Sequence, residues 1–266
     1  MPDDSLTRTI RAHKMGSQHI ITPRLNMWLM QNPNFDVDEA VADIIRDLLV
    51  KKQRNRSGSF SSSAAGSCLR RQIYAYLGIA TGEVNGPQLQ QIFNDGTWRH
   101  LRWQATLLQA GIIDSVEDML DWPAMRSMGS MDGRGVVPDD HPHAPWRGLE
   151  FGFELKGMNS FAFQPASRKP WPKDNHHQQI DRYFLSGGFD LFVVIYEDKN
   201  TQEWKEWVIE PDPDRMAAQR AELVVLNSHV DQQTIPPQLV ECAKQLKTGE
   251  FSKCPLRRQG RRLRQP

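Results

Sequence analysis

The clearest strand pattern in this chain is LEFGFELK, residues 149–156. Apolar and polar residues alternate along it with the two-residue period of a β-strand. Its apolar positions share one face, and Glu154 and Lys156 share the opposite face with Gly152. A carboxylate beside an ammonium suits a place where a cation meets a water molecule, because the carboxylate can hold the cation while the amine orients the water. The alternative is a strand with an ordinary charged outer face.

Helix and strand patterns alternate on both sides of this strand. The run FDLFVVIYE, residues 189–197, is continuously apolar, which is typical of a central strand buried on both faces. Asn175 can cap a helix that ends before Gly187 and Gly188. We predict helices over 36–53, 87–110, 175–185, 213–228 and 238–248, and strands over 112–120, 126–137, 149–156, 189–197 and 203–210. This order predicts an α/β (mixed α+β) fold, with a central mixed sheet flanked by helices.

Composition along the chain predicts three parts. Small residues fill the stretch SGSFSSSAAGS, residues 57–67, which indicates a linker. We therefore predict an N-terminal helical extension over 1–56, a core over 57–250 and a basic tail over 251–266, so that helical additions lie at both ends of the core. The tail carries five arginines and no acid. Such a run can contact phosphates through counterion release, or it can be a solvated tail.

Overall composition argues against several classes of protein. The net charge is only +1, so the whole chain is not a basic nucleic-acid clamp. No apolar stretch approaches the roughly 20 residues that span a bilayer, and the N-terminus lacks the apolar region of a signal peptide. We therefore expect no membrane partner. Three cysteines, an odd number, argue against a disulfide framework and suit a reducing cytoplasm.

A second carboxylate precedes the strand at Asp132, within GSMDGRGVV, residues 129–137. The spacing to Glu154 lets two neighbouring strands present two carboxylates to one hard cation, and Mg²⁺ takes one or two protein carboxylates. The alternative is a turn residue between glycines. The dipeptide Pro138-Asp139 also precedes Glu154, but it lies in a polar loop where its carboxylate is less fixed. We therefore favour Asp132.

Two helical pairs flank these carboxylates. Gly96 lies one turn before His100, and a glycine inside a helix suggests close packing or ligand access. Gln179 and Tyr183 are four residues apart and so share one helix face. Taken alone, the histidine reads as a structural residue and the second pair as an ordinary polar surface.

Together these motifs resemble the RecB-like branch of the PD-(D/E)xK nuclease superfamily. That branch includes the RecB nuclease domain, lambda-type exonucleases and the fourth family of CRISPR-associated exonucleases. Its pattern is a helix with G-x-x-x-H, a G-x-x-D-G-like strand, a strand with E-x-K and a helix with Q-x-x-x-Y. The matching segments here are 96–100, 130–133, 154–156 and 179–183, within a resemblance over about residues 60–210. It implies a restriction-endonuclease-like nuclease core.

The resemblance also implies roles for the matching residues. His100, Asp132 and Glu154 would bind Mg²⁺ or Mn²⁺, as one or two ions, since a histidine in the shell also accepts Mn²⁺. Lys156 would be the catalytic lysine. Gln179 and Tyr183 would complete the catalytic set by positioning DNA or the lysine. The ions would activate water and neutralise the charge that builds on the scissile phosphate.

Cysteines in this family often hold a [4Fe–4S] cluster, with one cysteine ahead of the core and three near the C-terminus. Only Cys68, Cys242 and Cys254 are present here. Because such clusters normally need four thiolates, we expect no cluster. Cys68 and Cys242 instead read as small buried residues.

The expected function is that of a Mg²⁺- or Mn²⁺-dependent deoxyribonuclease. The resemblance favours an exonuclease on linear ends or single strands, in DNA recombination and repair or in phage DNA processing. It allows a recombination partner protein and a homo-oligomer, in the cytoplasm of a bacterial or phage-infected cell. The alternatives are a structure-specific, resolvase-like endonuclease and a non-catalytic DNA-binding adaptor on a nuclease scaffold.

Aromatic and basic residues near the motifs are the expected DNA contacts. Exposed tryptophans can stack on unpaired bases, and Trp171 is one of several near the proposed site in sequence. Cations that neighbour the motifs are the more credible phosphate contacts. They are Arg99, Arg102, Arg168, Lys169 and Lys173.

Overall fold

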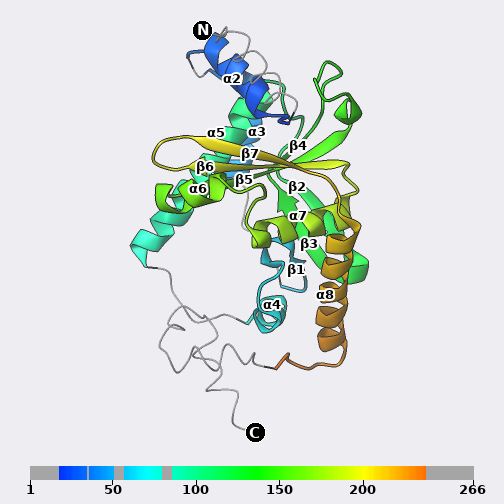
Figure 1. Ribbon diagram of the computed structural model, residues 1–266. Helices are drawn as coiled ribbons and strands as arrows, with labels where there is room; N and C mark the ends of the chain where they lie inside the picture. Colours follow the sequence, from blue (N-terminus) through cyan, green and yellow to red (C-terminus); the bar gives the residue numbers. More distant parts are fainter. Residues whose placement is uncertain (1–17, 35, 51–56, 80–85, 238–266) are drawn as a thin grey trace.

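The computed structural model describes residues 18–34, 36–50, 57–79 and 86–237. A four-stranded sheet lies at its centre, in the order β4-β5-β6-β7. Strands β5 and β6 run parallel, and the two outer pairs are antiparallel. The strands are β4 (Gly133–Val136), β5 (Glu150–Met158), β6 (Leu191–Asp198) and β7 (Trp204–Ile209). The mixed α/β fold class predicted from the sequence is confirmed (Figure 1).

A second, smaller sheet lies beside the first, in the order β1-β3-β2. It consists of β1 (Phe60–Ser61), β2 (Asp118–Trp122) and β3 (Ser127–Met131). The predicted linker over 57–67 is therefore wrong, because β1 pairs with β3 and Phe60 is buried. The predicted strand over 126–137 is in fact two strands, and the chain passes from the small sheet to the central sheet at Asp132.

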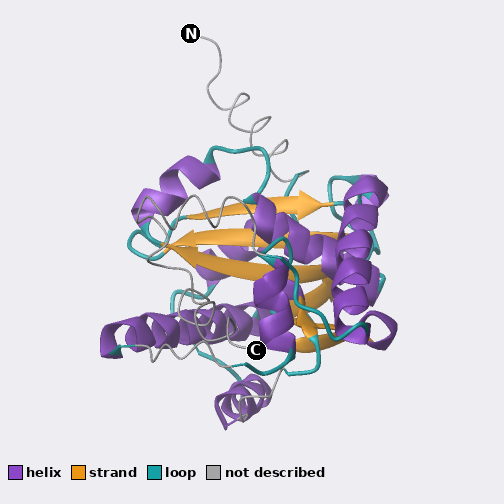
Figure 2. Cartoon of the chain, turned by 90° about the horizontal axis from the view of Figure 1, so that it is seen from below, coloured by secondary structure: helices purple, strands orange, loops and turns teal. Residues whose placement is uncertain are grey.

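Helices cover both faces of the central sheet (Figure 2). They are α2 (Thr22–Gln31), α3 (Glu39–Val50), α4 (Leu69–Tyr76), α5 (Pro87–Gln109), α6 (Ser160–Ser167), α7 (Asp174–Gly187) and α8 (Pro213–Asp231), with 3-10 turns η1 (Ser62–Ala64), η2 (Pro123–Met125) and η3 (Ala144–Trp146). In this described part of the chain no helix combines the length and the apolar character that crossing a membrane requires.

Helix ends follow local chemistry, with one correction. Pro87 opens α5, and the Asp212 carboxylate caps α8 by accepting from the N–H groups of Asp214 and Arg215. The expected cap at Asn175 is wrong, because α7 already begins at Asp174 and Lys173 occupies the cap position. The predicted helix over 238–248 lies outside the described residues.

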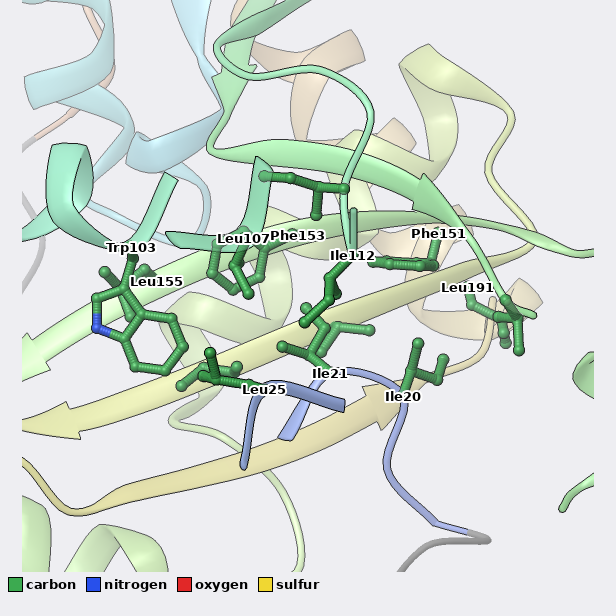
Figure 3. Packing of buried hydrophobic residues seen from close by; sticks show 14 residues of the cluster. Ile20, Ile21, Leu25, Trp103, Leu107, Ile112, Phe151, Phe153, Leu155 and Leu191 are labelled. Carbon is green, nitrogen blue, oxygen red and sulfur yellow. The ribbon is translucent and has the colours of Figure 1, made fainter. Parts of the chain in front are cut away.

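The apolar face of β5 forms the main core. Phe151, Phe153 and Leu155 are buried against α5 and the N-terminal segment that contains Ile20 and Ile21 (Figure 3). The opposite face of the sheet packs against α7, which also contacts the small sheet. The charged outer face considered for β5 is therefore wrong. Glu154 is only 4% exposed, so its carboxylate lies inside the protein.

Gly152 makes the close approach between the sheet and α7 possible. It lies on the same face of β5 as Glu154, next to Phe192 of β6. A Cβ atom at this position would lie 2.3 Å from the Phe192 ring. Phe192 stacks in turn on Tyr183 of α7, with ring centroids 5.3 Å apart. The glycine thus lets the aromatic rings approach the strand that carries the polar cluster.

The N-terminal segment is tied to the central sheet by one carboxylate. Glu206 of β7 accepts hydrogen bonds from the N–H groups of Ile20 (2.6 Å), Ile21 (3.1 Å) and Thr22 (2.7 Å). These are the orphan donors at the start of α2, so Glu206 caps that helix from another element. No periodicity in the sequence predicted α2, and residues 1–17 lie outside the described residues.

Replacing Glu206 should loosen this attachment. In Glu206→Gln one acceptor oxygen becomes an NH₂ group that faces N–H donors, and the negative charge at the helix start is lost. We expect the free energy of unfolding, measured by urea denaturation, to fall by about 2–3 kcal/mol. Glu203→Gln, in the exposed turn before β7, is the control and should change it by less than about 0.5 kcal/mol. Equal stability of the two variants would contradict the assigned role.

Candidate active site

The predicted site residues meet in one cleft of about 500 Å³. Its walls come from α5, from β1, η1 and β3 at the small sheet, and from β5 and α7. All six of the residues singled out by the motifs line it, although they are spread over 84 positions of the chain. They are His100, Asp132, Glu154, Lys156, Gln179 and Tyr183.

Asp132 is fixed where the chain passes between the two sheets. Its N–H donates to the Phe153 carbonyl (3.0 Å), and its Oδ2 accepts from the N–H of Leu155 (2.7 Å). Its Oδ1 lies 2.8 Å from Nδ1 of His100. Asp132 therefore lies on the same side of the sheet as the residues of β5 that carry the charges. Asp132 also occupies the bend between β3 and β4, so its position agrees with the turn-residue alternative while its carboxylate lines the cleft.

The side chains of Glu154 and Lys156 form an ion pair that α7 holds in place. Nζ of Lys156 donates to Oε1 of Glu154 (2.6 Å) and to Oε1 of Gln179 (3.0 Å). The Gln179 amide donates to Oε1 of Glu154 (2.9 Å) and to the Tyr183 hydroxyl (2.7 Å). Tyr183 donates to the Ser130 carbonyl (2.7 Å). A continuous chain of hydrogen bonds thus links β5, α7 and β3.

Burial and neighbouring charge set the protonation of the cluster. Burial, reinforced by the Asp132 charge, raises the pKa of Glu154 to about 7 against the opposing Lys156 ammonium. Burial alone would raise the pKa of Asp132, but the adjacent His100 lowers it. Despite its burial, the Asp132 carboxylate raises the pKa of His100 to about 9, and Glu154 raises that of Lys156. Two cations therefore balance two carboxylates between about pH 7 and about pH 9.

The cleft has donors suited to a divalent cation. Oε2 of Glu154 is buried and has no hydrogen-bond partner among the described residues, which is costly for a carboxylate oxygen. Two carboxylates and an imidazole beside this oxygen match the ligands that Mg²⁺ and Mn²⁺ accept. These side chains lie next to one another but do not yet face one shared point. Within the described ranges, no three His, Cys, Asp or Glu side chains already surround one metal position.

The other expectations about site residues have different outcomes. Asp139 is exposed in the loop after β4 and does not line the cleft, in agreement with the preference for Asp132. Arg99 and Arg102 share the buried carboxylate of Glu197 on β6, and their contacts with phosphate stay predictions. Cys68 is a free thiol and is half-buried rather than buried.

One carboxylate in the cleft was missed by the sequence analysis. Glu117 accepts from the Ser130 hydroxyl (2.8 Å) and from the Gln104 amide (3.2 Å). Its φ of 54° lies in the left-handed region, which is uncommon for glutamate. Gln104 also donates to the Asp132 carbonyl (2.9 Å), so it links the two acidic residues. The only sequence signal was the position of Gln104, one helical turn after His100.

Comparison with known proteins supports the fold. No model of a known protein family matches the chain, and no curated protein matches it in sequence. The crystal structure of LHK-Exo in complex with dAMP is similar, with a TM-score of 0.50 and 15% identity over 74% of this chain and 96% of that chain. A structure of the alkaline exonuclease LHK-Exo from Laribacter hongkongensis has a TM-score of 0.49 and 16% identity, again over 74% of this chain and 96% of that chain. At this identity the likeness concerns the fold alone, and it shows that the mixed α/β fold of this chain is similar to that of LHK-Exo.

Protonation of Glu154 should make stability depend on pH when no divalent cation is present. The pKa of Glu154 is about 7 in the fold and near its usual 4.5 in the unfolded chain. The folded state then holds the proton more tightly, so the free energy of unfolding falls as pH rises from 5 to 8. In Glu154→Gln this fall should be smaller. Urea denaturation in a chelator at both pH values measures it, with Glu203→Gln as the control. Equal pH dependence in wild type and Glu154→Gln would contradict the assignment.

Proposed function

We propose that this protein is a divalent-cation-dependent deoxyribonuclease that acts as an exonuclease on linear DNA. The observation that carries the proposal is the meeting of Asp132, Glu154 and Lys156 in one cleft, with the aspartate bonded to the backbone of the strand that holds the other two. A scaffold that only bound DNA would not require a buried carboxylate pair beside a buried ammonium, because burying charges costs free energy. The adaptor alternative therefore has less support.

Each side chain of the cluster has a role in this proposal. Asp132, Glu154 and His100 would hold Mg²⁺ or Mn²⁺, which when bound supplies an activated water and neutralises charge on the phosphate. Lys156 would orient the attacking water and stabilise the negative charge that develops on the phosphate oxygens. Gln179 would position both Lys156 and Glu154, since its amide contacts both.

The exonuclease assignment draws on the structural neighbour. LHK-Exo is an alkaline exonuclease, and its structure contains dAMP, a mononucleotide. The likeness of fold and the order of the motifs support the same reaction here. A role in recombination, repair or phage DNA processing, with or without a partner protein, is part of the proposal.

Loss of any of the three central side chains should abolish DNA hydrolysis. We expect wild type to degrade linear duplex DNA with Mg²⁺ or Mn²⁺ and to stop when a chelator is added. Asp132→Asn, Glu154→Gln and Lys156→Ala should each lower the rate by about a thousandfold or more, since members of one catalytic unit act together. Release of acid-soluble nucleotide measures the rate.

The control for these variants is Asp139→Asn, which removes an exposed carboxylate close in sequence and should keep the wild-type rate. Closed circular DNA should resist the enzyme if it acts on ends, and cleavage of circular or branched DNA would indicate the endonuclease alternative. If wild type binds DNA but hydrolyses no form of it with either ion, the nuclease proposal is wrong.

Gln179 should affect the rate through the residues it holds. Gln179→Leu keeps the approximate size of the side chain but removes the hydrogen bonds to Lys156, Glu154 and Tyr183. We expect kcat to fall by about 10–100-fold, as for other groups that orient catalytic residues, while KM for DNA changes little. The matched control is Gln178→Leu on the same helix, whose amide contacts Asp174 instead. Wild-type kcat in Gln179→Leu would rule out this positioning role.

A further inference from the structure

Residues 157–173, which run from the last two residues of β5 through α6 to the residue before α7, form a basic stretch. It contains no aspartate or glutamate and carries Arg168, Lys169 and Lys173. All three side chains are exposed, and within the described part of the chain none forms an ion pair with an acid. Arg99 and Arg102 differ, because both form ion pairs with Glu197. The segment therefore presents free positive charge to the solvent.

The same segment exposes two aromatic rings. The side chain of Phe161 is 92% exposed and that of Trp171 is 57% exposed. Trp171 lies beside the imidazole of His177, with ring centroids 6.1 Å apart. A single exposed ring is ordinary, but rings interleaved with unpaired cations are the combination that binds unpaired bases and their phosphates.

The backbone of this segment is held by the central sheet. The indole N–H of Trp207 on β7 donates to the Lys169 carbonyl (3.1 Å), and the Lys173 N–H donates to the Tyr196 hydroxyl on β6 (2.7 Å). The rings of Trp207 and Tyr196 pack together, with centroids 4.7 Å apart. Because the backbone is already fixed, a ligand that binds here loses less free energy to ordering than it would on a flexible loop.

The segment begins next to the cleft. Tyr196 is the register partner of Lys156 on the neighbouring parallel strand, so the two side chains project from the same face of the sheet. The Tyr196 hydroxyl then contacts both the Lys173 N–H and Nδ1 of His176, in the first turn of α7. Both ends of the segment are therefore held near Lys156, because residue 157 follows it in the chain and Lys173 is bonded to Tyr196 on the neighbouring strand.

We propose that residues 157–173 bind a single-stranded part of the DNA substrate. Phe161 and Trp171 stack on unpaired bases, and Arg168, Lys169 and Lys173 contact the phosphates that join them. This inference rests on the proposed function in taking DNA as the substrate, and it specifies which form of DNA. In a duplex the base faces are already stacked, so the preferred ligand is an unpaired strand at a DNA end, of any sequence.

The binding experiment uses the full chain, a fluorescently labelled (dT)₁₂ and a chelator, so that no cleavage takes place. Trp171→Ala and Phe161→Ala should each raise the Kd, measured by fluorescence anisotropy, by about five- to hundredfold, the range for loss of one stacked base. Trp171→Phe keeps a ring and should recover most of the affinity. Met30→Ala is the control, because Met30 is an equally exposed apolar residue (86%) on α2.

The cations are tested through the salt dependence of binding. Replacing Arg168, Lys169 and Lys173 together by alanine should lower the slope of log Kd against log salt by about 2, since each single-strand phosphate contact contributes about 0.7. Arg46→Ala on α3, a similarly exposed cation, should leave the slope unchanged. All of these side chains are at the surface, so circular dichroism should show an unchanged fold.

Failure of this inference can be distinguished from failure of the proposed function. Wild type that does not bind (dT)₁₂, or unchanged affinity and salt slope in the variants, would overturn the inference even if the enzyme cuts DNA. Weakened binding in the variants of a wild type that cuts no DNA would support the inference and refute the nuclease. If Trp171→Ala and Phe161→Ala lost binding to anionic phospholipid vesicles while their DNA affinity stayed the same, the segment would be a membrane-binding surface instead.

Discussion

The hydrogen bond from the Leu155 N–H to the Asp132 carboxylate is the contact on which the cleft depends. It is buried, and it joins the point where the chain enters the central sheet to the middle of the strand that carries Glu154 and Lys156. Because one oxygen of Asp132 is used in this bond, the other is directed to His100. One side chain thus joins the connection between the two sheets to β5 and orients the histidine on α5.

The polar cluster is stable in a buried place because its members satisfy one another. Burying carboxylates and ammonium groups costs several kcal/mol for each isolated ion, and pairing and hydrogen bonding offset that cost. Gln179 and Tyr183 extend the network to the Ser130 carbonyl, so few polar atoms remain without a partner. Among the described residues of this cluster, Oε2 of Glu154 is the buried oxygen that has no hydrogen-bond partner. A purely structural ion pair would have its buried acceptors satisfied, so this oxygen is a candidate ligand for a cation.

Local patterns in the sequence predicted most of the central sheet, and the family resemblance picked out the six residues that line the cleft together. The alternation in 149–156 and the apolar run in 189–197 are strong signals, because burial on one or both faces of a strand fixes residue type at every position. The four motifs then placed His100, Asp132 and Gln179 in the right order. Their meeting could be expected from the family resemblance but not from periodicity, which contains no information about contacts distant in sequence.

The failures have physical causes as well. Residues 57–67 read as a linker because small residues are typical of loops, yet their small size is what lets β1 and η1 lie close to α7. A Cβ on Gly66, for example, would lie 1.4 Å from the side-chain oxygen of Gln178 on α7. Glu117 and the capping role of Glu206 were missed because each acts on residues far along the chain. Asp132 was expected inside one strand, since no local signal shows that a strand changes sheets.

The parallel pairing of β5 and β6 has a consequence for how the cleft forms during folding. Parallel neighbours need a long crossover, and here that connection contains both α6 and α7. Gln179, which contacts Lys156 and Glu154, therefore lies inside the loop that must close before β6 can pair with β5. The β4–β5 pair can bring Asp132, Glu154 and Lys156 together by itself, but Gln179 reaches Lys156 and Glu154 only once this non-local closure is complete. An incompletely folded chain therefore lacks the amide that holds the ion pair in place.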